Sequence, residues 1–338
     1  MVGVRPRSCA IADTGDYPGT TPAPYHRIVR LPRLSPRAYR RVTLFALLAL
    51  AFIVVTGAAV RLTGSGLGCS DWPRCEQNQF VAPLEYHAMV EFVNRTITGL
   101  VSVAVVLAVL GSLVREPRRS DLTRWSLGLV AGVIGQIVLG AIVVKSELAP
   151  VSVIGHFLLS TVLIWNAVVL HERAGHAGSR GVPTVAGRVV RLGRAMVATT
   201  LAVTVAGTVV TATGPHGGDE HAERLGFDIG EVTRVHTLLV WLLLVLTLGA
   251  LWAVQRDGPP QAVANRGRWL VAAIVVQGTI GYAQYFTGVP PLLVGLHVVG
   301  SIVVWVAVLR FHLGLFAHPE PERPQHAPIS AVPAASHS

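Results

Sequence analysis

Three histidines in the sequence stand inside apolar segments, where an ionisable side chain is a candidate for function. His156 and His297 each lie a few residues inside an apolar segment, each with a serine four residues later, and His236 lies at the same depth as His297. One imidazole from each of two helices fills both axial positions of a haem and leaves no open site for a substrate. A zinc site usually takes further ligands, and neither a Cys nor a carboxylate stands at this depth. His236 and His297 are therefore predicted to hold a haem, with a proton relay as the competing interpretation.

A second group of polar residues combines a base, an acid and a cation on one helical face. Residues 85–95 read Glu-Tyr-His-Ala-Met-Val-Glu-Phe-Val-Asn-Arg, so a single stripe carries His87, Glu91, Asn94 and Arg95. Polar groups at lipid depth face the interior of a helix bundle. The carboxylate could move protons and the guanidinium could hold a haem propionate. The alternative is an ion pair between Glu91 and Arg95 that only stabilises the bundle.

Two cysteines flank a short loop next to this stripe. Residues 63–75 read Thr-Gly-Ser-Gly-Leu-Gly-Cys-Ser-Asp-Trp-Pro-Arg-Cys. A disulfide between Cys69 and Cys75 is sterically easy and is expected in an oxidising compartment. It is either structural or redox-active. The glycines do not form a phosphate-binding loop, because no Lys follows them.

Long apolar segments must position all of these residues. The chain has 338 residues, of which 51% are hydrophobic and only 14% are charged. A helix needs about 20 mainly apolar residues to cross a bilayer. Eight such segments occur, at roughly 42–61, 87–114, 122–144, 152–171, 190–211, 232–254, 267–288 and 292–316. The predicted fold class is therefore all-α, an integral membrane protein with eight transmembrane helices.

The arginines set the predicted orientation of these helices. They cluster before the first segment and in every second loop after it, whereas the intervening loops carry acids such as Asp71 and Asp219. By the positive-inside rule, both termini are predicted to be cytoplasmic, and the candidate chemistry lies at the opposite helix ends. This placement accounts for the net charge of +10 without nucleic acid as a partner.

The termini and the basic residues suggest a cellular setting. Residues 1–41 are rich in Pro and Arg and residues 317–338 are polar, so both are predicted to be disordered cytoplasmic tails. The 28 basic residues include a single Lys, Lys145, a bias typical of GC-rich bacterial genomes. The expected location is the bacterial cell membrane.

The two halves of the chain echo each other. Val55–Gly64 resembles Val205–Gly214, and five residues of the first half recur 141 positions later: Gln136, Gly140, Pro150, His156 and Ser160 match Gln277, Gly281, Pro291, His297 and Ser301. Four spans separate the copies, so both point the same way across the membrane. The predicted domains are two pseudo-repeated four-helix bundles, 42–171 and 190–316, joined by a cytoplasmic linker, 172–189.

Together these residues resemble the haem A synthase family in an actinobacterial-like variant. The resemblance covers 42–316 and is carried by the Gly-Ser-Gly-x-Gly-Cys loop with Trp72, Pro73 and Cys75, the Glu-x-x-Asn-Arg stripe and the three histidines. It implies an oxidoreductase acting on a CH3 group, which converts the C8 methyl of haem O to a formyl group. The product would be haem A for cytochrome c oxidase, with water as the oxygen source.

The resemblance also implies a role for each half. The second half would hold haem b for electron transfer, with His236 and His297 as axial ligands of its iron. The first half would hold the substrate haem, with His156 facing its iron and Glu91 as the catalytic carboxylate. The loop between the two cysteines would shape the approach to this site.

The sequence departs from the family pattern at two places. Asn94 stands where many members have His, so the second ligand of the substrate haem is Asn94, His87 or none. The loop 214–230 lacks a second cysteine pair that some members carry, and contains His216 and His221, which are expected to be solvated.

Two other functions fit parts of the sequence. A non-catalytic di-haem b-type cytochrome in quinone-linked electron transfer would need two complete ligand pairs and no Glu91. A proton-coupled transporter would usually have broken helices near the midplane of the membrane. The expected partners are haem O, a membrane electron acceptor and the lipid bilayer, with a haem O synthase and a second copy of the chain as candidates.

Overall fold

Eight long helices make up most of the part of the chain that the structure describes. The computed structural model describes residues 33–76, 81–176, 181–258 and 260–318. The helices are α1 (Pro36–Leu62), α2 (Tyr86–Val114), α3 (Ser120–Lys145), α4 (Pro150–Ala174), α5 (Gly187–Thr213), α6 (Ile229–Arg256), α7 (Gln261–Phe286) and α8 (Pro291–Leu313). All eight are long and apolar enough to cross a bilayer, so the chain is a multi-pass membrane protein. The predicted tails lie outside the described residues, except for 33–41 and 317–318.

The helices extend beyond the apolar segments at most of their ends. α1 begins at Pro36 rather than at residue 42, because Ser35 caps it by accepting a hydrogen bond from the Ala38 N–H at 3.2 Å. Asp228 caps α6 in the same way, through the Glu231 N–H at 2.9 Å. Polar caps therefore set these ends, and the run of apolar residues locates only the membrane-spanning middle.

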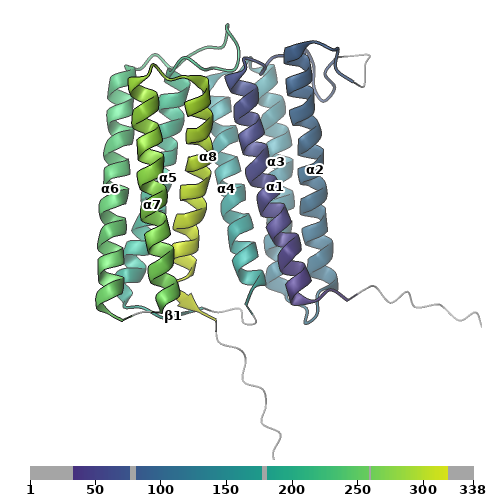
Figure 1. Ribbon diagram of the computed structural model, residues 1–338. Coiled ribbons are helices and arrows are strands. Elements are labelled where there is room, and N and C mark those ends of the chain that lie inside the picture. Colours follow the sequence, from purple (N-terminus) through teal and green to yellow (C-terminus); the bar gives the residue numbers. More distant parts are fainter. Residues whose placement is uncertain (1–32, 77–80, 177–180, 259, 319–338) are drawn as a thin grey trace, which may run out of the picture. The chain divides into compact units, whose positions relative to one another are not determined.

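The helices pack as two neighbouring groups of four. Figure 1 shows α5–α8 on the left and α1–α4 on the right. In the first group each helix packs on the next and α1 also packs on α4; in the second, α5 closes on α8 in the same way. Helices α2 and α4, and likewise α6 and α8, therefore stand diagonally opposite each other, where their side chains can face a shared interior.

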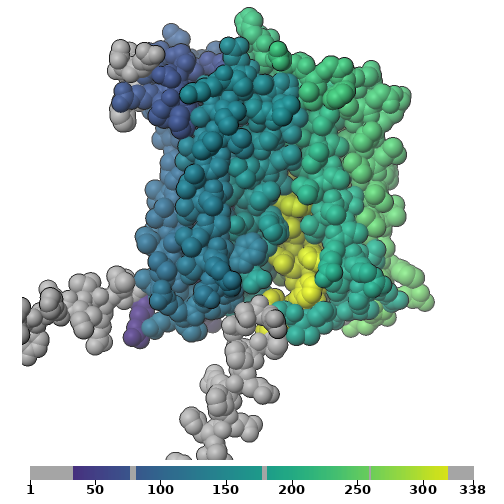
Figure 2. Space-filling view, turned by 180° about the vertical axis from the view of Figure 1, so that it is seen from behind, coloured from purple at the N-terminus to yellow at the C-terminus, as the bar shows by residue number. Residues whose placement is uncertain are grey.

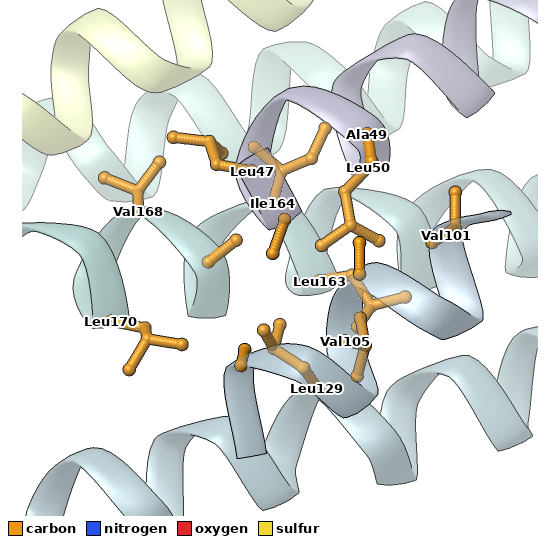
Figure 3. Close-up of a cluster of buried hydrophobic side chains, with 14 of the residues drawn as sticks. Leu47, Ala49, Leu50, Val101, Val105, Leu129, Leu163, Ile164, Val168 and Leu170 are labelled. Atoms are coloured by element: carbon orange, nitrogen blue, oxygen red, sulfur yellow. The ribbon is translucent and has the colours of Figure 1, made fainter. Parts of the chain in front are cut away.

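The first group encloses an apolar core, and one helix of the second group completes it. Figure 3 shows Leu50, Val105 and Leu163 side by side in this buried cluster. Trp305 of α8 joins the cluster and donates a hydrogen bond from its indole Nε1 to the Thr161 carbonyl at 3.0 Å. From behind, yellow side chains of α8 are visible between the teal surfaces of the two groups (Figure 2). The two halves thus share a packed interface.

At the arginine-rich helix ends, ionic contacts also join the halves. Glu172 of α4 is buried and pairs with Arg310 of α8 at 2.9 Å and Arg266 of α7 at 3.6 Å. Nearby, β1 (Val182–Pro183) pairs antiparallel with β2 (Phe316–Ala317). The His176 and His318 rings stack with centroids 4.2 Å apart, and burial lowers the pKa of both imidazoles. The segment between the halves is therefore fastened to the end of α8.

At the opposite helix ends, two turns are built alike. The α3–α4 turn contains Leu148 with φ 61° and the α7–α8 turn contains Val289 with φ 60°, a conformation that non-glycine residues rarely adopt. The Leu148 N–H donates to the Val143 carbonyl at 2.9 Å, and the Val289 N–H donates to the Gln284 carbonyl at 2.7 Å. All these residues correspond at the offset of 141. The equivalent turns support the predicted repeat.

Candidate functional site

In the second half, two imidazoles face each other across the helix group. His236 of α6 and His297 of α8 have ring centroids 6.3 Å apart. Two imidazoles that bind opposite sides of one metal ion, at about 2 Å each, place their centroids roughly 6 Å apart. The residues present therefore fit a haem held by two histidines.

A backbone carbonyl fixes the ring of one of these histidines. The carbonyl oxygen of Val203 in α5 can only accept a hydrogen bond, so His236 Nδ1, at 3.0 Å, must carry the proton. Nε2 is then left with its lone pair free for a metal, the arrangement in which many metal-binding histidines are held. His297 Nδ1 is buried and has no hydrogen-bond partner among the described residues.

Equivalent neighbours hold His156 and His297. The Gln136 side chain donates from Nε2 to the His156 carbonyl at 3.1 Å, and Gln277 donates to the His297 carbonyl at 2.8 Å. A glycine also lies beside each ring: a Cβ at Gly140 would lie 3.6 Å from His156 Cε1, and a Cβ at Gly281 would lie 3.1 Å from His297 Cε1. In each half, a Gln side chain thus binds the backbone carbonyl of the histidine, and a Gly lies next to the imidazole ring.

The first half has an amide where the second half has its other imidazole. Asn94 of α2 contacts the part of α1 that matches the part of α5 next to His236. Its Oδ1 accepts a hydrogen bond from Thr56 Oγ1 at 2.8 Å, and Thr56 also donates to the carbonyl of Ile53, which matches Val203 at the offset of 150. Asn94 also lines a mainly apolar pocket of about 440 Å³ between α1 and α2, together with Val60 and Met89. At this place α2 therefore presents an amide instead of an imidazole.

The predicted disulfide is present and is tied to the acidic residue of the stripe. Cys69 and Cys75 are bonded, which confirms the pairing. Glu91 is only 5% exposed, and its Oε2 accepts a hydrogen bond from the Cys69 N–H at 2.8 Å. The disulfide loop is therefore fixed directly to the first turns of α2.

Arg95, the cation of the stripe, binds the same loop. Arg95 binds Glu91 Oε1 through Nη2 at 2.5 Å and Nε at 3.1 Å. Its Nη1 donates to the carbonyls of Asp71 and Arg74, each at 2.9 Å. Glu91 and Arg95 thus form the ion pair that was the alternative interpretation of the stripe, and this pair also clamps the disulfide loop.

The remaining histidines at this end lie apart from these groups. His87 is exposed in the first turn of α2, and its Nδ1 is 2.9 Å from Ser65 Oγ in the disulfide loop. His216 Nε2 lies 2.8 Å from the Val289 carbonyl, while His221 is exposed beside Asp219. The structure thus brings together His236 and His297, and separately Glu91 and Arg95, but it leaves His87 at the surface.

The sequence reasoning missed one charged residue, Arg61. It lies in the last turn of α1, and its Nη2 donates to the Thr211 carbonyl of α5 at 2.7 Å. Its Nε is buried and has no hydrogen-bond partner among the described residues. The signal was available, because Arg61 is a lone cation at the end of an apolar segment whose repeat counterpart, Thr211, is neutral.

No cluster of three or more metal-binding side chains occurs in the described ranges. A haem needs at most two from the protein, so His236 and His297 suffice in the second half. Glu91 and Glu172 are the buried carboxylates among the described residues, and they lie at opposite ends of the helices.

Comparison with known families decides the relationship of the chain. The model of the COX15-CtaA family, cytochrome oxidase assembly protein, matches residues 40–87 and 81–216, slightly more than half of the chain. The chain belongs to this family. The resemblance to this family is thereby confirmed. The matched residues contain the disulfide loop, the stripe and His156, and they end before His236 and His297.

Several curated relatives of this COX15-CtaA protein carry the name heme A synthase. The protein of Exiguobacterium sibiricum is 25% identical over 144 residues, which cover 41% of this chain and 48% of the relative. That of Geobacillus kaustophilus is 30% identical over 118 residues, 34% of this chain and 36% of the relative. That of Oceanobacillus iheyensis is 28% identical over 112 residues, 32% of this chain and 36% of the relative. The matched part of the chain thus spans about half or less of the length of these relatives.

Proposed function

We propose that this COX15-CtaA protein is a haem A synthase, which oxidises the C8 methyl group of haem O to a formyl group with water as the oxygen source. The relatives named heme A synthase support this activity. The observation that carries it is the difference between the halves: two facing imidazoles in one, and Asn94 at the equivalent place in the other.

The second half is proposed to hold haem b between His236 and His297. Bound there, haem b supplies one-electron transfer, and its two imidazoles leave no open position for a substrate. Val203 keeps the His236 ring in the tautomer that presents Nε2, so the ligand is oriented before the haem arrives. The electrons pass on to a membrane acceptor.

The first half is proposed to hold the substrate haem, with His156 facing its iron. Oxidation of a methyl group releases protons, and a buried carboxylate is a suitable acceptor. Glu91 is the buried carboxylate at this end, and Arg95 with the Cys69 N–H fixes both of its oxygens. Asn94 or no protein group would complete the substrate haem on its other side, because His87 is exposed and lies against Ser65.

The arginine pattern supports the proposed setting of the enzyme. The arginine-rich ends of the helices would face the cytoplasm of a bacterial cell, with both termini on that side. The haem sites would then lie toward the outer face of the cell membrane. A haem O synthase and a second copy of this chain are proposed as candidate partners.

The test is to express the chain in a host that makes haem O but no haem A, and to identify the extracted haems by chromatography. Haem b together with haem A is expected. Haem b alone, with haem O left unconverted in the membrane, would contradict the synthase and favour a di-haem b-type cytochrome.

A further inference from the structure

We infer that Arg61, a residue of the first half, binds a propionate carboxylate of the haem held by the second half. This inference rests on the proposed function, because it requires haem between His236 and His297. The group that Arg61 would bind is a carboxylate, located at the helix ends next to the disulfide loop.

Arg61 is a half-buried cation that lacks an anion among the described residues. Of its donors, Nη2 binds the neutral Thr211 carbonyl at 2.7 Å, and Nε is buried without a hydrogen-bond partner in the described part of the chain. No described carboxylate lies within 4.0 Å of it. A buried charge without a counter-ion is costly, and a carboxylate is the group that a guanidinium binds best, through two parallel hydrogen bonds.

The position of Arg61 relates it to the haem of the second half. Thr211, its carbonyl partner, lies one helical turn beyond Gly207, where a Cβ would be 3.1 Å from His236 Cε1. The neighbouring Leu62 lies close to α8. A Cβ added at Gly295, two residues before His297, would lie 3.4 Å from Leu62 Cδ1. The guanidinium therefore lies about one turn, roughly 5 Å, beyond the level of the two imidazoles, on their disulfide side. A haem bound there would be expected to direct its carboxylates to this side, because it is nearer to water.

A second cation stands close to the first. Arg224, in the loop between α5 and α6, is held by the Pro215 carbonyl at 2.7 Å, and its guanidinium lies against Gly217. A Cβ at the next residue, Gly218, would lie 3.6 Å from Arg61 Cγ. Two like charges repel each other, and a bound anion would relieve both. Arg95, by contrast, already has a carboxylate and two close loop carbonyls, so its donors are occupied. Arg61 is thus the better cation for a propionate.

The test measures how each variant of the full-length chain distinguishes iron protoporphyrin IX from its dimethyl ester, which has no carboxylates. Wild type should bind the diacid roughly tenfold or more tightly, as expected for a charge-assisted hydrogen-bonded pair. Arg61→Gln should lose this preference, and Arg61→Lys should keep part of it. Arg234→Gln is the matched control, because Arg234 is at the same end but is exposed and paired with Glu231.

The ratio of the two affinities separates recognition from folding, because misfolding weakens binding of both haems. A wild-type ratio in both Arg61 variants would overturn the inference. If wild type converts haem O but does not prefer the diacid, the inference fails while the synthase stands. If it binds neither form, both fail.

The His297→Ala background shows which haem presents the carboxylate to Arg61. Loss of the Arg61 effect in this background is expected. A persistent effect would assign the carboxylate to the first-half haem and overturn the second-half assignment.

Discussion

Each half surrounds one histidine with the same types of residue, but the side chain opposite this histidine differs between the halves. A Gln side chain binds the carbonyl of His156 in one half and of His297 in the other, and a Gly lies beside each ring. Across the group, the second half presents His236 and the first half presents Asn94. Among the described residues at these helix ends, only the first half adds a buried acid, Glu91, and a disulfide loop. Similar surroundings of one histidine thus accompany different groups opposite it.

This difference teaches how such a scaffold can separate two tasks. A haem with two imidazole ligands is closed to substrates and suits electron transfer, whereas a site with one imidazole and a nearby carboxylate leaves room for chemistry.

The largest expected effect follows loss of a ligand from the imidazole pair. His297→Ala should remove haem b from the purified protein, because the iron loses one of its two protein ligands, whereas His156→Ala should retain it. The measurement is the haem content per chain, from the haemochrome spectrum in pyridine. Equal loss of haem b in both variants would break the assignment of roles to the halves.

The next effect concerns the acid that only the first half contains. Glu91→Gln should lower conversion of haem O by roughly 100-fold, the contribution of a general acid or base, while haem b stays bound. The amide oxygen can still accept from the Cys69 N–H, so the loop contact is kept. Glu231→Gln, an exposed acid at the same helix ends, is the control. Conversion at the wild-type rate in the Glu91 variant would leave Glu91 with a structural role only.

A third change makes the halves more alike. Asn94→His places an imidazole where the second half has His236, so the substrate haem should acquire a second histidine ligand. Addition of haem O should then produce a second low-spin absorption spectrum, which wild type lacks. An unchanged spectrum would show that this position of α2 does not face the iron.

The smallest effect compares the two glycines. Gly281→Ala should weaken haem b binding several-fold, about 1 kcal/mol, because the added Cβ would lie 3.1 Å from the His297 ring. Gly140→Ala should be close to neutral, since the corresponding distance to His156 is 3.6 Å. Rates of haem b transfer to an acceptor protein would measure both. A larger loss from Gly140→Ala would reverse the proposed assignment of haem b.

Much of this arrangement could be predicted from the sequence. Long apolar segments reveal membrane helices directly, and two cysteines in a short loop reveal a disulfide. The helix ends were harder to predict, because the capping residues Ser35 and Asp228 lie outside the apolar segments. The orientation of His236 could not be predicted at all, since its partner is the backbone carbonyl of Val203, which any residue could supply.

The role of the charged stripe shows the same limit. Its spacing predicted that Glu91 and Arg95 share a face, and they do form an ion pair. Spacing could not show that both also bind the disulfide loop, because those partners are main-chain N–H and carbonyl groups. Arg61 was overlooked for a related reason: its Nε becomes enclosed only when the end of α1 packs beside α5 and α8.

The central claim is that the halves ligate haem differently, and low-temperature magnetic circular dichroism in the near infrared tests it most directly. The near-infrared charge-transfer band identifies a haem iron with two imidazole ligands. We predict one such haem per chain, both before and after haem O is added. Two haems per chain with paired imidazoles would contradict the account and identify the protein as a di-haem cytochrome.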